Sequence, residues 1–268
     1  MALKKICTAG GHSKAAPGAK SYLNEYVEDR KVNRALQAAL KAYGYTTKDA
    51  SNEKRTQGAE LAEEVRICNA FGADLFAAVH FNASKKTSKK MGVEVFYYSG
   101  SATGKKYAAA VAKELAALLG LPNRGAKASK SLYVLRKTKA PAILVEVCFV
   151  DSKADAAAYK AVGAAKVGQA IAAAIHKTNG GKVAATKAPA KANKTASKAT
   201  TAKASTSKSY KVKITASALN VRAGAGTKYR VNTTVKKGGV YTIVQEKNGW
   251  GKLKSGAGWI KLSYTKKI

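Results

Sequence analysis

The stretch Asp74-Leu-Phe-Ala-Ala-Val-His-Phe-Asn-Ala-Ser84 decides the fold. Five apolar residues in a row, followed by His80, indicate a strand buried on both faces, as in a parallel sheet. Ligands of open α/β sheets bind at the carboxyl ends of such strands, so His80 is a candidate functional residue. The alternative is a core histidine that makes one hydrogen bond, and this stretch by itself leaves that alternative open.

Two further apolar runs are of the same kind. The first, residues 3–9, leads into Gly10-Gly11-His12-Ser13, where the paired glycines permit a tight turn. The second, residues 139–151, contains Glu146 among Ile, Leu, Val and Phe. Burying an unpaired carboxylate is costly, so Glu146 needs a cation, a metal or a raised pKa. A buried salt bridge is the structural alternative to a functional role.

The segments between these runs alternate in pattern. Helical spacing of apolar residues predicts helices over residues 25–43, 58–72, 103–119 and 153–176. Short strands are predicted from residue 45 and over residues 92–98 and 131–135, and the stretch with Pro122, Arg124 and Gly125 is predicted to be a loop. Alternating strands and helices indicate one α/β domain that ends near residue 177.

The composition changes after this domain. Residues 178–208 contain Ala, Lys, Thr and Ser with almost nothing bulky, which predicts a flexible linker. An arm that binds polyanions without specificity is the alternative for this segment. Residues 209–268 show alternating strand patterns separated by glycine-rich turns, and they predict a small all-β barrel.

Charge is distributed unevenly along the chain. The formal net charge is +34, and all but one of the 15 acidic residues precede residue 178. So basic a C-terminal part implies a polyanionic partner. Nucleic acid, anionic lipid and the teichoic acids of a Gram-positive cell wall all have this chemistry.

The three cysteines, Cys7, Cys68 and Cys148, match no zinc or disulfide spacing. Each lies in an apolar run, so we predict buried reduced thiols, and these favour folding in a cytoplasm. The N-terminal stretch has no apolar region of signal-peptide length, and no apolar run is long enough to span a membrane. We therefore expect synthesis in the cytoplasm without a signal peptide and release by another route.

Two of the three histidines, His12 and His80, follow predicted parallel strands, whereas His176 lies on the last predicted helix and is expected to be a bystander. Two histidines and a carboxylate form a zinc site that leaves one position open, which is typical of catalysis. A second buried carboxylate can then act as general base toward water.

Residues 1–176 resemble the zinc-dependent N-acetylmuramoyl-L-alanine amidases of the amidase-3 family, especially clostridial phage endolysins. The resemblance rests on the following stretches: Gly11-His-Ser13, Asn24-Glu-Tyr26, Val79-His-Phe-Asn-Ala-Ser84, Asn123-Arg-Gly-Ala126, Leu132-Tyr-Val-Leu135 and Leu144-Val-Glu-Val-Cys-Phe149. It implies a mixed, mostly parallel sheet of about six strands flanked by helices.

The same resemblance implies that His12, Glu25 and His80 bind Zn²⁺ and that Glu146 is the catalytic acid and base. Many relatives open the first helix with another pattern, and an alignment on Asn33 would select Asp29 as the third ligand. The Asn-Glu-Tyr match favours Glu25.

Residues 209–268 resemble the bacterial SH3 (SH3b) wall-binding module. The similarity lies in Ala218-Leu-Asn-Val-Arg-Ala-Gly224, Gly249-Trp-Gly-Lys252 and Gly258-Trp-Ile260. Trp250 and Tyr229 are candidate peptide-binding aromatics, and the alternative is that they belong to the core of the barrel.

Together the two resemblances imply a peptidoglycan hydrolase, an endolysin that cuts the amide between N-acetylmuramic acid and L-alanine and binds a Gram-positive wall. If it is phage-encoded, a holin pore would release it. A host autolysin or spore-cortex amidase would have the same chemistry. Two rival hypotheses differ in chemistry: a cysteine amidase that uses Cys148, and a non-enzymatic cationic protein that binds wall polymer or nucleic acid.

Overall fold

The computed structural model describes residues 3–183, 209–222, 224–227, 229, 231–255 and 257–268. The chain divides into two compact units, Met1–Ala190 and Lys191–Ile268. Most of the predicted linker, residues 184–208, lies outside the described residues. None of the described helices has the length and apolar character needed to cross a membrane.

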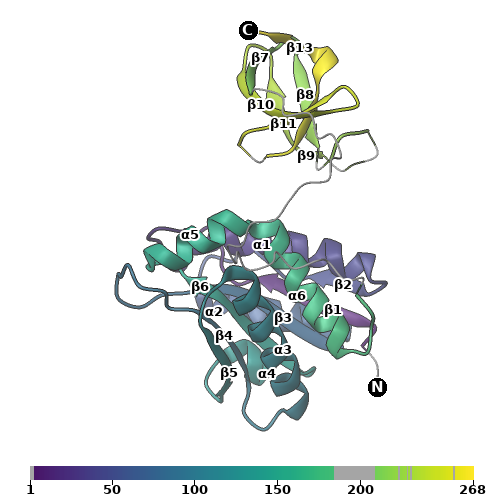
Figure 1. The fold of residues 1–268 in the computed structure, drawn as a ribbon. Coiled ribbons are helices and arrows are strands. Elements are labelled where there is room, and N and C mark those ends of the chain that lie inside the picture. The colour runs from purple at the N-terminus through teal and green to yellow at the C-terminus, as the bar shows by residue number, and fades with distance from the viewer. Residues whose placement is uncertain (1–2, 184–208, 223, 228, 230, 256) are drawn as a thin grey trace, which may run out of the picture. The chain divides into compact units, whose positions relative to one another are not determined.

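The first unit is built on a six-stranded sheet (Figure 1). In spatial order the strands are β2 (Thr46–Asp49), β1 (Lys5–Gly10), β3 (Leu75–Asn82), β6 (Ala142–Phe149), β4 (Val93–Tyr98) and β5 (Asn123–Ser129). Every neighbouring pair is parallel except β6 and β4, which are antiparallel. The mixed, mostly parallel sheet expected from the sequence is confirmed.

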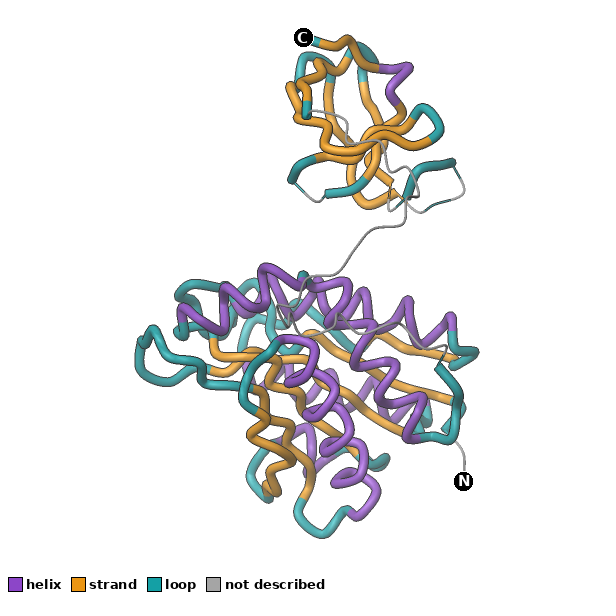
Figure 2. Tube along the Cα trace, viewed as in Figure 1, coloured by secondary structure: helices purple, strands orange, loops and turns teal. Residues whose placement is uncertain are grey.

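Helices cover both faces of this sheet (Figure 2). One face packs against apolar residues of α1 (Glu25–Ala42), α3 (Ala102–Leu119), α5 (Lys153–Val162) and α6 (Ala164–Thr178). The other packs against α2 (Gln57–Phe71) and the short α4 (Tyr133–Lys137). The central strands are therefore apolar on both faces, which explains their unbroken hydrophobic runs.

The two-residue period of the strands determines where the polar side chains emerge. Ala78 on β3 and Leu144 on β6 lie under α2 and α4. Two residues further along each strand, on the same face, the side chains are His80 and Glu146, which are register partners. Glu94 of β4 is the partner of Glu146 on its other side. The sheet thus places three polar side chains in a row where its helical cover ends.

Three sequence predictions of local structure are wrong. Residues 123–129 form the edge strand β5 instead of a loop, and an edge strand with one hydrogen-bonded neighbour tolerates this polar sequence. Residues 133–137 form α4 instead of a strand, because so short an apolar run fits either state. The single predicted last helix is broken into α5 and α6 at Gly163, whose φ of 83° is outside the helical region.

A disulfide joins Cys7 of β1 to Cys68 of α2, with their Cα atoms 5.6 Å apart. The prediction of three reduced thiols is therefore wrong for these two, and the argument for cytoplasmic folding loses its basis. The pair forms because β1 and α2 pack on the same side of the sheet, a contact between residues 61 positions apart. Cys148 is a buried free cysteine, as expected.

Removing this disulfide by Cys7→Ala and Cys68→Ala together is expected to lower the free energy of unfolding. The bond closes a loop of 61 residues, for which chain entropy gives about 4 kcal/mol. Urea unfolding of the wild type with and without a reducing agent measures the effect, and the double variant should be insensitive to the reductant. Superimposable wild-type curves under both conditions would contradict the prediction.

The second unit is a seven-stranded antiparallel sheet in the order β13-β7-β10-β11-β12-β8-β9. Its strands are β7 (Tyr210–Ile214), β8 (Ala218–Arg222), β9 (Val231–Lys236), β10 (Val240–Lys247), β11 (Trp250–Leu253), β12 (Trp259–Lys261) and β13 (Thr265–Lys267). Alternate side chains of these strands form a small core of their own: Val212, Ile214, Leu219, Val221, Val235, Ile243, Leu253 and Ile260. The predicted all-β unit is confirmed.

Candidate active site

His12 follows β1 and is nearly buried, with 8% of its surface exposed. Its Nδ1 lies 3.1 Å from the carbonyl oxygen of Ala16, so that nitrogen carries the proton and donates it. The lone pair of Nε2 is then available, and Nε2 lies 3.0 Å from Oε1 of Glu25. Histidines that ligate a metal through one ring nitrogen typically donate the N–H of the other nitrogen to a fixed acceptor, as Nδ1 of His12 does here.

Glu25 is the first residue of α1, directly after the N-cap Asn24, whose side chain accepts from the amide of Val27. One carboxylate oxygen, Oε2, accepts from the amide of Ala19, and Oε1 accepts from the amide of Phe81. Burial alone would raise the pKa of Glu25, but the imidazoles of His12 and His80 beside the carboxylate outweigh burial and lower it. Glu25 is therefore an ionised, tightly held carboxylate.

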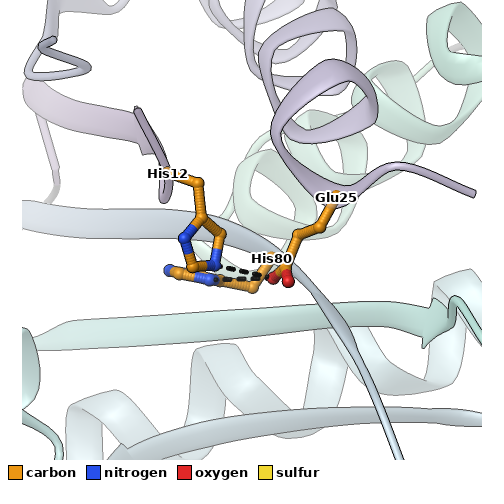
Figure 3. Close-up of side chains that lie close together, drawn as sticks. All are labelled: His12, Glu25 and His80. Atoms are coloured by element: carbon orange, nitrogen blue, oxygen red, sulfur yellow. Dashed lines mark hydrogen bonds and ion pairs between the residues drawn. The ribbon is translucent and has the colours of Figure 1, made fainter. Parts of the chain in front are cut away.

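His80 completes the group (Figure 3). Its Nδ1 lies 3.2 Å from the same Oε1 of Glu25, and its ring meets that of His12 edge-on at 4.9 Å. Burial lowers the pKa of His80, so its neutral form is favoured. One ligand atom from each of His12, Glu25 and His80 lies within 4.8 Å of the others. The structure thus brings together the three side chains selected from the sequence.

This group has the chemistry of a zinc site. Two imidazoles and a carboxylate are a donor set of catalytic zinc centres. The glycines around them leave no room for larger side chains. A Cβ on Gly11 would overlap the imidazole of His80, and one on Gly18 would lie 2.5 Å from Oε2 of Glu25. His80 Nε2 is buried and has no hydrogen-bond partner among the described residues.

Glu146 stands beside this group on the neighbouring strand, at the register position of His80. Its Oε2 is buried and has no hydrogen-bond partner in the described part of the chain. Burial raises the pKa of Glu146 well above its usual value, and the nearby carboxylates of Glu25 and Glu94 raise it further. The described residues therefore give Glu146 a raised pKa and no buried salt bridge.

Comparison with known proteins assigns the family. The family described as N-acetylmuramoyl-L-alanine amidase (Amidase_3) matches residues 6–177, and the bacterial SH3 domain matches residues 217–266. The chain belongs to the amidase-3 family.

Several relatives resemble the amidase-3 domain. An uncharacterized protein of Clostridium perfringens is 34% identical over 173 residues, which are 64% of this chain and 51% of that protein. The endolysin of Bacillus phage SPP1 is 39% identical over 108 residues, 38% of each chain. The chain therefore spans about half or less of the length of these relatives. The solved catalytic domain of CD27L endolysin, described as targeting Clostridia Difficile, has a TM-score of 0.59 and 30% identity, over 64% of this chain and 96% of that one.

Asp29, the alternative third ligand, lies outside the His12–Glu25–His80 group of the amidase-3 domain. It is fully buried, and burial raises its pKa to about 9. The nearest cation is Arg30, whose Nε lies 3.9 Å from Oδ1 of Asp29. The same Nε donates to the carbonyl oxygen of His12 at 3.0 Å, so Arg30 anchors the loop that carries His12.

The sequence reasoning missed this anchor and two buried acids of α2. Acidic residues of an amphipathic helix are expected on its exposed side. Glu60 and Glu64 of α2 nevertheless have no exposed surface. Burial raises the pKa of Glu60 to about 7 and that of Glu64 well above its usual value. His176 packs between Tyr43 and Tyr45, away from the other two histidines.

A third missed feature is a polar cluster next to Glu146. Glu94 is 5% exposed and accepts hydrogen bonds from Asn82 Nδ2 at 2.7 Å and from Arg124 Nε at 2.6 Å. The signal that could have found it is the one that selected Glu146: an acid within the apolar strand Gly92-Val-Glu-Val95. The loop predicted around Arg124 gave that residue no role.

The bacterial SH3 domain contains a hollow of about 400 Å³. It is lined by Trp250 and Tyr264 together with the cations Arg222 and Lys261. Trp250 is 7% exposed, so it contributes both to the buried interior and to the wall of the hollow. Tyr229, the other candidate aromatic, is 41% exposed and does not line this hollow.

Proposed function

We propose that the protein hydrolyses the amide bond between N-acetylmuramic acid and the L-alanine of the peptide stem, with Zn²⁺ held by His12, Glu25 and His80. The observation that carries this proposal is the convergence of these side chains beside Glu146, whose Oε2 is buried and has no hydrogen-bond partner among the described residues. A bound zinc ion would polarise the scissile carbonyl and acidify water.

Glu146 moves the proton in this proposal. Its Oε2 takes the proton of the attacking water and then delivers it to the nitrogen of the leaving amine, which must be protonated to depart. The environment supports the second step, because burial raises the pKa of the carboxyl and so strengthens its hold on the proton. The neighbouring Glu94 is already bound by Asn82 and Arg124, whereas Oε2 of Glu146 has no partner in the described part of the chain.

The rival cysteine mechanism has no support in the structure. Cys148 is fully buried, and burial raises the pKa of its thiol well above its usual value. The thiolate is the nucleophilic form, so this environment disfavours it.

Product analysis tests the proposal. Purified peptidoglycan treated with the protein should gain free amino groups on L-alanine, and the number of reducing sugar ends should not change. New reducing ends would indicate cleavage between sugars and would refute the proposed bond. Release of neither product would refute hydrolysis and favour the non-enzymatic cationic protein.

We further propose that the SH3 domain holds the enzyme on a Gram-positive wall and that its cations bind anionic polymers such as teichoic acids. The tether raises the local substrate concentration without adding catalytic contacts. The aromatic and basic lining of the hollow supports this role. Release from the cell that makes the protein, through a holin pore if it is phage-encoded, is part of this proposal.

A chain cut after residue 183 is expected to keep its activity on soluble muramoyl peptides but to bind walls at least about tenfold more weakly, because the tether is lost. This end point keeps Asn179, whose Oδ1 accepts from the amide of Leu3 at 2.8 Å and ties α6 to the start of β1. Cosedimentation with purified walls at low and high salt measures binding. Equal binding of the truncated and full-length chains would contradict the assigned role.

A further inference from the structure

Arg124 lies at the same end of the strands as the His12–Glu25–His80 group, because β5 runs parallel to β4 and β4 runs antiparallel to β6. It is the second residue of β5 and sits where the register with β4 shifts, between the pairs Val93–Asn123 and Glu94–Gly125. Its Nε donates to Oε2 of Glu94, and Glu94 is the register partner of Glu146. Arg124 is therefore connected to Glu146 through Glu94.

The guanidinium of Arg124 is fixed but not saturated. Its carbon lies 5.1 Å from the centre of the Phe149 ring, and its Nε is bound to Glu94. Its two terminal nitrogens make no hydrogen bond with any described residue, and 37% of the side chain is exposed. A guanidinium carries five N–H donors in a planar fork that suits a carboxylate. Four donors are thus preorganised and available to a ligand.

The distance to the reacting bond restricts what this ligand can be. His80, Glu146 and Glu94 occupy three neighbouring strands, which places Glu94 about 10 Å from His80. An extended peptide advances about 3.5 Å per residue. If Arg124 binds a group of the peptide stem, that group lies within about three residues of the cleaved amide.

We propose that Arg124 binds a free carboxylate of the peptide stem shortly after L-alanine and so makes the enzyme select acidic over amidated stems. This inference rests on the proposed function. The alternative is a structural ion pair in which Arg124 only holds Glu94. This alternative gives no role to the four remaining donors of the guanidinium.

The test compares two soluble muramoyl peptides that differ only in whether the carboxyl group of the residue after L-alanine is free or amidated. The wild type is expected to show a kcat/KM at least about tenfold higher for the free acid, the size typical of one hydrogen bond between charged groups. The difference should lie mainly in KM. Equal kcat/KM values for the two peptides would overturn the inference without any variant.

Arg124→Gln should bring the two kcat/KM values together by lowering that of the acid alone, and Arg124→Lys should keep part of the preference. Arg136→Gln is the matched control: Arg136 is an exposed arginine over the Tyr133 ring on α4 and should leave the preference unchanged. An equal loss of kcat on both peptides in Arg124→Gln would indicate the structural ion pair and overturn the inference. A wild type that cleaves neither peptide would overturn the proposed function as well.

Discussion

Replacing Glu146 by glutamine is expected to slow wall lysis by about a hundred- to ten-thousandfold, the usual contribution of a general acid and base. Glutamine has nearly the same shape, but it cannot take a proton from water or give one to the leaving amine. The buried Oε2 of Glu146 makes no hydrogen bond with any described residue, so the substitution breaks no described contact of that oxygen. The folded structure should therefore survive the change.

Turbidity of a wall suspension measures this effect, and cosedimentation with walls shows whether binding is retained. Glu114→Gln is the matched control, because Glu114 pairs with Lys177 at 3.1 Å on the exposed surface, with 38% of its side chain exposed. We expect the control to lyse walls at the wild-type rate. If Glu146→Gln retained more than about a tenth of that rate, Glu146 would not be the acid and base proposed here.

The strand residues of the site could be predicted because burial makes polar side chains conspicuous. In β3 and β6 nearly every position is apolar, so His80 and Glu146 stand out in the sequence. The same argument applies to Glu94 in β4. Arg124 could not be found in this way, because a basic residue in a polar edge strand resembles a basic residue in a loop.

The choice between Glu25 and Asp29 shows the limit of pattern reasoning. The two residues are four apart on α1, so they lie on one face of the helix and one turn from each other. Only the docking of α1 on the sheet separates them, since it places the first helical turn beside His80 and Asp29 beside Gly10. The Cys7–Cys68 bond was beyond prediction for the same reason, because it depends on how α2 packs against β1.

Removing zinc is expected to abolish activity and to lower the melting temperature, and adding zinc should restore both. The His12–Glu25–His80 group places a carboxylate oxygen within 3.2 Å of two imidazole nitrogens. A cation bound among these atoms would neutralise the buried carboxylate of Glu25 and coordinate the lone pairs of the buried imidazole nitrogens. Zinc at a thousand times its dissociation constant would stabilise the fold by about 4 kcal/mol.

The histidines provide a matched pair of variants for this test. His80→Gln should lose bound zinc, as measured by elemental analysis after dialysis, and its melting temperature should no longer respond to added zinc. His176→Gln should keep both, because His176 stacks on Tyr43 with ring centres 4.3 Å apart and bonds to the hydroxyl of Tyr45, outside the group. Its fold should weaken slightly, while its zinc content and lytic rate remain those of the wild type. Stoichiometric zinc in purified His80→Gln would refute the proposed zinc ligands. Full lysis by the metal-free enzyme would refute the metal mechanism.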